Sequence, residues 1–166
     1  EGKEAAEMFD EIAEKFNQIW NMYSSIDEFI SADNILKYAF QVHENSLIYD
    51  YYLKDNFAPI TQELIDFVDA ILDALNCLTR FFLHDQEKSE AIHSMVAFGS
   101  YDVAIPFIIK GYLYRLPKNE MDVLISLLGR IVARHEILEE ERGLDQALSI
   151  EFSNFTKENK SVYPVI

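Results

Sequence analysis

Residues 61–82, with the sequence TQELIDFVDAILDALNCLTRFF, decide the fold class of this chain. Their apolar side chains recur at steps of four and three, which places them on one face of an α-helix of about six turns. They are Leu64, Val68, Ile71, Leu75, Leu78 and Phe82. Thr61 is a suitable N-cap, and Glu63 suits the positive end of the helix dipole. We therefore predict a long helix whose apolar stripe faces the core.

Similar periodicity precedes this segment. A predicted helix ends at a Ser-Ser pair and carries seven apolar residues on one face: Met8, Phe9, Ile12, Phe16, Ile19, Trp20 and Tyr23. Most aromatic side chains of the chain are expected to fill the core. A second helix is expected to be capped by Asp33 and to end at residues 43–46. Residues 47–57 are rich in aromatic side chains and predict a short helix that ends before Pro59.

Four further helices are predicted downstream. The first is expected to be capped by Asp85 and to end at Gly99, and the second to be capped by Asp102 with Pro106 in its first turn. The third and longest is expected to start at Asn119 and to be followed by Gly143. The last is expected to start at Leu144. The longest helix is expected to point Met121, Leu124, Ile125, Leu128, Ile131, Val132 and Leu138 inward. The last is expected to use Leu144, Ala147, Leu148 and Phe155.

The fold class follows from these periods. No segment alternates strongly with period two, so we predict an all-α protein, an orthogonal or antiparallel multi-helix bundle of about seven or eight helices. We expect one helical domain over residues 1–156 and a polar tail over residues 157–166. The chain begins at Glu1 rather than at a methionine, so we expect it to be a piece of a longer protein.

The charge and composition of the chain narrow the range of functions to be expected. The chain has 29 acidic residues against 14 Lys plus Arg, a formal net charge of −15. Direct binding to duplex DNA is not expected, because it requires clustered positive charge. One cysteine, Cys77, excludes an intrachain disulfide. No apolar run is long enough to predict a membrane span, and no signal sequence is recognisable, so we expect a cytoplasmic protein.

Few residues in the sequence suggest chemistry. Glu90 and His93 form one Glu-x-x-His pair on a predicted helix and are the candidate metal ligands, although a di-metal bundle needs two such pairs. Arg130 and Arg134 share a helix face and are candidates for an anion or partner contact. No phosphate-binding loop or nucleophile elbow is present. We therefore predict no catalytic residues and no cofactor.

Four stretches carry a resemblance to a known family. They read FNQIW from Phe16, DNILKY from Asp33, AIPFII from Ala104 and LLGRIVAR from Leu127. In this order they resemble the helical region of GmrSD-type, modification-dependent restriction proteins, which have a ParB-like nuclease domain, and of their uncharacterised relatives. The family's Asp-Gly-Gln-Gln-Arg string and its His-Asn-His-type nuclease are absent from this sequence. Of its positions, Arg134 and Pro106 carry over, and neither is catalytic.

The resemblance implies a non-catalytic helical domain that packs against, or regulates, nuclease parts outside this sequence. Its partners would then be missing domains of the same polypeptide or another protein. Two alternatives come from the residues themselves. One is a free-standing acidic interaction module, such as an immunity protein or a DNA mimic, because carboxylates can imitate phosphates. The other is an enzyme or ligand carrier with a pocket between helices, which the aromatic content permits.

Overall fold

A computed structural model describes residues 2–48, 62–85, 89–98, 101–138 and 143–160 of the chain. These residues form seven α-helices and one π-helical segment, with no strand among them. The elements are α1 (Gly2–Tyr23), α2 (Ala32–His43), α4 (Gln62–Thr79), the π-helical η1 (Arg80–Asp85), α5 (Glu90–Phe98), α6 (Ile105–Leu113), α7 (Lys118–Leu138) and α8 (Leu144–Asn154). The all-α, multi-helix prediction is confirmed.

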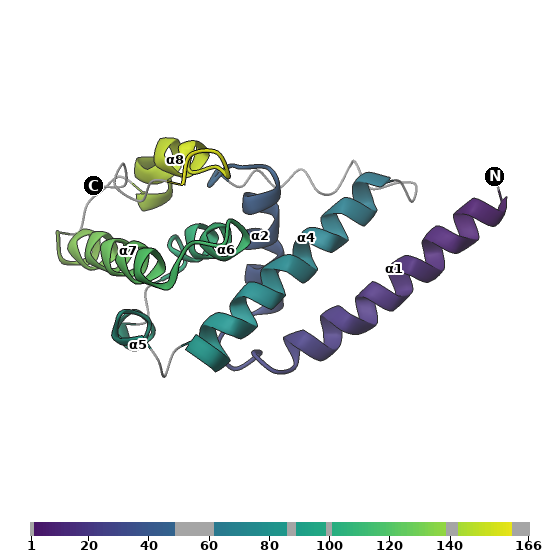
Figure 1. The fold of residues 1–166 in the computed structure, drawn as a ribbon, viewed down its shortest axis with the longest axis horizontal. Coiled ribbons are helices and arrows are strands. Elements are labelled where there is room, and N and C mark those ends of the chain that lie inside the picture. Colours follow the sequence, from purple (N-terminus) through teal and green to yellow (C-terminus); the bar gives the residue numbers. More distant parts are fainter. Residues whose placement is uncertain (1, 49–61, 86–88, 99–100, 139–142, 161–166) are drawn as a thin grey trace.

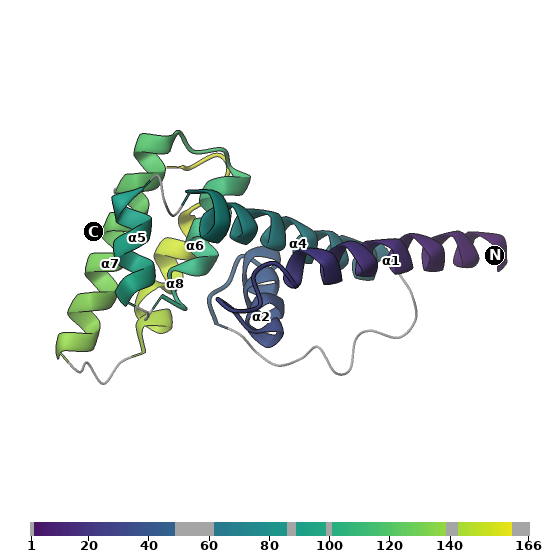
Figure 2. The same cartoon turned by 90° about the horizontal axis from the view of Figure 1, so that it is seen from below.

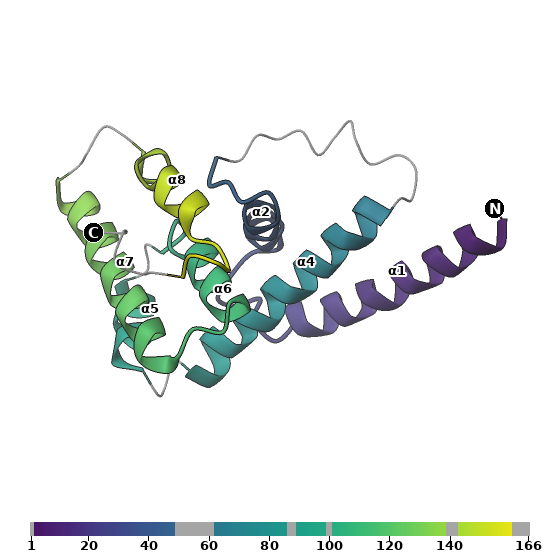
Figure 3. The ribbon, with the colours of Figure 1, turned by 45° about the horizontal axis from the view of Figure 1, so that its top comes forward.

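The helices form an arm and a body. Helices α1 and α4 lie side by side, and their far ends project away from the cluster of α5, α6, α7 and α8 (Figures 1 and 2). Helix α2 packs against α4 and α6 (Figure 3). Because α4 contacts α1, α2 and α6, it is the element that joins the arm to the body.

The apolar stripe of α4 lies in the core, as its periodicity predicts. Val68, Ile71, Leu75, Leu78 and Phe82 are buried. Leu64, nearest the far end of the arm, is half-buried. The predicted cap Thr61 and most of the helix expected over residues 47–57 lie outside the described residues, and Leu47 and Ile48 are not helical.

Helix α6 is the most deeply buried element of the body. Every residue from Ile105 to Gly111 is buried, including Lys110. A Cβ added at Gly111 would lie 2.6 Å from the sulfur of Met121 on α7, so a side chain at this position would require the Met121 side chain to move. Pro106 occupies the first turn of α6, as predicted, where its missing N–H costs no hydrogen bond.

Lys110 holds the C-terminal end of α8 against α6. Its ammonium is fully buried and donates to the carbonyl oxygens of Phe152 and Phe155, at 2.5 and 3.0 Å, and to Oδ1 of Asn45 at 2.5 Å. It also lies 3.6 Å from the centre of the Phe152 ring. A helix leaves its last carbonyl groups without intrahelical donors, and a cation there also interacts favourably with the helix dipole. Lys110 thus caps α8 from a different helix.

Asn45 brings α2 into the same junction. Its φ of 54° is left-handed, and the amide N–H groups of Asn45 and Ser46 donate to the carbonyls of Val42 and Gln41. This is a Schellman motif, with asparagine at the position that glycine usually takes. The Asn45 side chain and carbonyl also bond Ser153 on α8. The junction therefore connects α2, α6 and α8.

Several predicted helix boundaries are wrong by a few residues. The cap of α2 is Ser31, which accepts from the N–H of Asn34, rather than Asp33. Helix α5 is capped by Ser89 rather than Asp85. Asp102 caps no helix and instead accepts a hydrogen bond from Tyr38. Gly143 has a φ of −56° and precedes α8 as its N-cap, so it is not the left-handed C′ residue expected.

The buried stripe of α4 gives a first prediction. Replacing Leu75, which is fully buried, by alanine leaves a cavity and should lower the free energy of unfolding by about 2–5 kcal/mol. Asn76→Ala, at an exposed neighbouring position, is the matched control and should change it by less than about 0.5 kcal/mol. Chemical denaturation measures both. Equal effects of the two variants would contradict the assigned register.

Lys110 gives a second prediction, in which stability depends on pH. Burial lowers the pKa of Lys110 from 10.5 to about 8 because it penalises the charged form. Between these values the unfolded chain binds more protons than the folded one, so this lysine makes the free energy of unfolding rise with pH. We expect Lys110→Met to be destabilised at pH 7, by about 2–4 kcal/mol, because buried carbonyl groups lose their donor.

The same comparison at higher pH tests the titration. The difference in unfolding free energy between wild type and Lys110→Met should grow by about 2 kcal/mol from pH 8 to pH 10. The measurement is urea denaturation at each pH for both proteins. A difference that stays constant over this range would mean that Lys110 does not titrate there in the folded state.

Candidate functional site

Three aromatic residues of α1 face solvent. Phe9, Phe16 and Trp20 are 59%, 53% and 68% exposed. On the same helix Ile12 is buried, while Met8, Ile19 and Tyr23 are half-buried. These three rings are thus exceptions to the expectation that most aromatic side chains fill the core. We call Phe9, Ala13, Phe16 and Trp20 the aromatic stripe, because Ala13 is also exposed and lies between the rings along the helix.

Among the described helices, α1 has one main neighbour, and this leaves the stripe exposed. It packs along α4, and the far part of this pair projects from the body (Figure 1). A contact between two helices buries a narrow row of side chains on each. The apolar residues of α1 cover a wider face than that, and Ile12 occupies the row nearest α4. The positions of the stripe are separated by four, three and four residues, which is a second apolar row parallel to the first.

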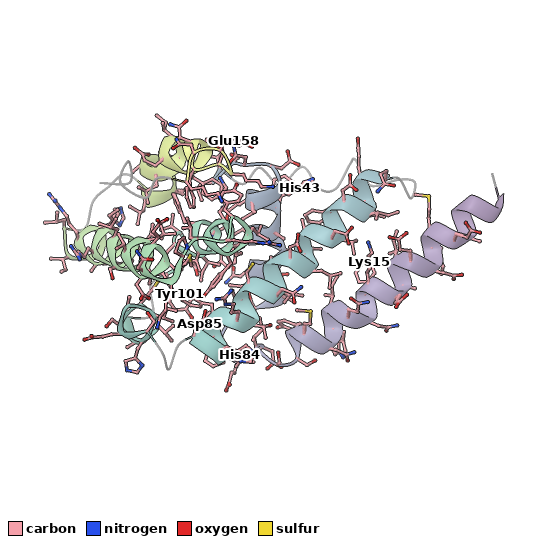
Figure 4. The ribbon with its side chains drawn as sticks, viewed as in Figure 1. Lys15, His43, His84, Asp85, Tyr101 and Glu158 are labelled. Carbon is pink, nitrogen blue, oxygen red and sulfur yellow. The ribbon has the colours of Figure 1, made fainter. Side chains whose placement is uncertain are left out.

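The two helices of the arm are strongly acidic. Together α1 and α4 carry nine Asp or Glu residues and two lysines. Lys15 of α1 bridges the helices, with its ammonium 2.6 Å from Asp69 on α4 and 2.9 Å from Glu11 (Figure 4). Hydrogen bonds to Asp69 and Glu11 raise the pKa of Lys15. Partial burial, and then the charge of Asp69, raise the pKa of Asp73. The arm is thus an aromatic row beside a surplus of carboxylates.

Two of the four residues singled out from the sequence line a different feature. A groove of about 630 Å³ separates α5 from α7, and both Glu90 and Arg130 line it. His93 and Arg134 are exposed and do not line this groove. Serine hydroxyls from both helices, of Ser89, Ser94 and Ser126, make up much of its polar wall. The structure therefore brings Glu90 and Arg130 to one groove but does not join them to His93 or Arg134.

Metal binding receives no support from the geometry of the described part of the chain. Within residues 2–48, 62–85, 89–98, 101–138 and 143–160, no three His, Cys, Asp or Glu side chains are placed to hold one metal ion. Glu90 and His93 lack a third ligand of these types there. Across those same residues, no helix combines the length and apolar character needed to cross a membrane.

A polar cluster that the sequence did not reveal lies where η1 meets α6. Asp85 accepts from the guanidinium of Arg80 and from the hydroxyl of Tyr112, each at 3.0 Å. Arg80 also lies 4.8 Å from the centre of the Tyr112 ring. Burial, followed by the charge of Asp85, raises the pKa of Tyr112. Because donors and acceptors are mutually satisfied, this cluster fastens η1 to α6 (Asp85 is labelled in Figure 4).

A second tyrosine is held in a similar way. The hydroxyl of Tyr38 on α2 donates to Asp102 at 2.8 Å, and burial together with this bond raises its pKa. Burial also raises the pKa of the Cys77 thiol to about 12, so it is a protonated, unreactive group at neutral pH. These groups stabilise the helical body.

The chain matches no known protein-family model, and no curated protein or solved structure matches it. The relationship to the helical region of GmrSD-type restriction proteins therefore stays a prediction based on the four stretches quoted above.

The position of the stripe predicts how α1 responds to substitution. Phe16→Ser should change the free energy of unfolding by less than about 0.5 kcal/mol, because the ring is already exposed. Ile12→Ala, one turn away on the buried row, should cost about 2 kcal/mol or more. Thermal or chemical unfolding compares them. If Phe16→Ser proves as costly as Ile12→Ala, the stripe is covered by the chain itself.

Proposed function

We propose that this chain is a non-catalytic helical domain that binds a protein partner, or a neighbouring domain of a longer polypeptide, through the aromatic stripe of α1. The observation that carries the proposal is the exposure of Trp20, Phe16 and Phe9 in one row of a regular helix. Large apolar side chains grouped on a surface mark sites of interaction, and tryptophan is among the residues that contribute most to binding.

The arrangement suits a docking site for physical reasons. A helix holds its side chains in fixed relative positions, so little conformational entropy is lost when a partner covers them. Each aromatic ring buries a large apolar area when it is covered. Helix α1 runs outward from the α5–α8 cluster toward its N-terminus, so a partner can approach this helix without displacing the body (Figure 2). Binding here needs no rearrangement of the core.

The resemblance to restriction proteins gives this proposal a biological setting. Phe16 and Trp20 belong both to the stripe and to the FNQIW stretch that resembles the family. In that setting the stripe would pack against nuclease parts supplied by other sequence and position or regulate them. The acidic surface of the arm is also compatible with the alternative function, a free-standing acidic module that binds a basic partner. Both readings use the same surface and differ in the occupant.

A comparison of two triple variants tests the proposal. The stripe variant is Phe9→Ser, Phe16→Ser, Trp20→Ser, and the control is Val123→Ser, Ile137→Ser, Ile150→Ser, at exposed apolar positions of α7 and α8. Proteins are captured from a lysate of the source organism, or remaining domains of the reading frame are supplied as a separate chain. Each captured protein is then purified and titrated against wild type and both variants.

We expect a partner that binds wild type and the control variant equally and the stripe variant at least about tenfold more weakly, because the rings are the anchors. Far-UV circular dichroism confirms that both variants are folded. The proposal fails if every purified partner binds the stripe variant as tightly as the wild type, or if none binds the wild type.

A further inference from the structure

We infer that the occupant of the aromatic stripe is an amphipathic helix with an apolar seam flanked by lysine or arginine. This inference rests on the proposed function and specifies the partner. The stripe defines the shape of the partner, and the carboxylates of the arm define its charge.

The spacing of the stripe fits a second helix. Phe9, Ala13, Phe16 and Trp20 follow one another at four, three and four residues, the pattern by which one helix packs its seam into another. The row extends over about 16 Å, which matches roughly two heptads of a partner. Ala13 is the smallest side chain of the row, and a large aliphatic side chain of the partner would pack over it.

The charges on this side of α1 disfavour an acidic partner. Asp10, one residue after Phe9, stands at a position that flanks the row, and Glu14, one residue after Ala13, lies further round the helix; both are exposed. Lys15 does not offset them, because its ammonium is bonded to Glu11 and Asp69. Opposite charges at the positions flanking a helical seam select partners, and like charges repel them. A basic flank on the partner therefore complements this surface.

The same charges disfavour a second copy of the chain. Pairing α1 with another α1 would bring two helices together that each carry five carboxylates and two lysines. The formal charge of −15 per chain adds long-range repulsion at low ionic strength. A heterologous basic helix meets neither obstacle, so it is the occupant that the surface favours.

Two designed peptides test this inference. Both are helical peptides of three heptads with leucine at the seam positions and no tryptophan. One carries lysine and the other glutamate at the flanking positions. Trp20 is the only tryptophan of the chain, so its fluorescence reports coverage of the stripe directly. Sedimentation velocity of the chain alone, over a range of concentrations, measures self-association.

We expect the lysine peptide to shift Trp20 emission to shorter wavelength and to bind at least about tenfold more tightly than the glutamate peptide. Its Kd should rise with salt between about 50 and about 300 mM, because the flanking contacts are exposed. Phe9→Ser with Phe16→Ser should weaken binding at least about tenfold. Asp10→Asn with Glu14→Gln should reduce the preference for lysine, whereas Ile150→Ser, on α8, should change nothing.

Four results would overturn the inference. The peptides could bind with equal affinity, the Phe9 and Phe16 substitutions could leave lysine-peptide binding intact, or the chain alone could form a dimer that Phe16→Ser dissolves. Absence of binding by both peptides would also end it. A natural partner that binds the wild type but not the stripe variant would still support the proposed function after any of these results. The failure of this inference and the failure of the proposed function can therefore be told apart.

Discussion

Within the described part of the chain, the packing of α1 mainly against one helix, α4, is the constraint on which the surface of the arm depends. Helix α4 is packed by α1, α2 and α6, so its apolar side chains are buried on most sides. Helix α1 meets mainly α4, and one row of its side chains, represented by Ile12, is buried. The next row holds Phe9, Phe16 and Trp20 in solvent. The apolar face of α1 is thus wider than the area that α4 covers, and the uncovered part is the proposed docking surface.

Sequence periodicity predicted the class of the fold and the stripe of α4, because a helix surrounded by others buries most of its apolar residues. It could not predict the exposure of Trp20, since periodicity does not tell how many neighbours a helix has. The boundaries failed for a related reason. Serine and aspartate are both good N-caps. The chain offers Ser31 and Asp33 before α2, and Asp85 and Ser89 before α5. Which residue of each pair caps the helix depends on which helix turn packs against the body.

The junction at Lys110 could not be read from the sequence at all. A lysine within an apolar segment suggests a solvent-facing position, yet this one is buried because its acceptors come from Asn45, Phe152 and Phe155, which are distant in the chain. The candidate site shows the same limit. Glu90 and Arg130 do share a groove. The exposed rings of α1 were not singled out from the sequence, because the same residue types serve cores and interfaces.

Quenching of Trp20 fluorescence by acrylamide, in the chain without a partner, tests the central claim most directly. If α1 presents its aromatic row to solvent, quenching should approach that of a free tryptophan derivative, and the emission should be that of a hydrated indole. Quenching several-fold weaker than this, together with emission at shorter wavelength, would show that the chain itself covers the stripe, and the account of α1 as a docking helix would be contradicted.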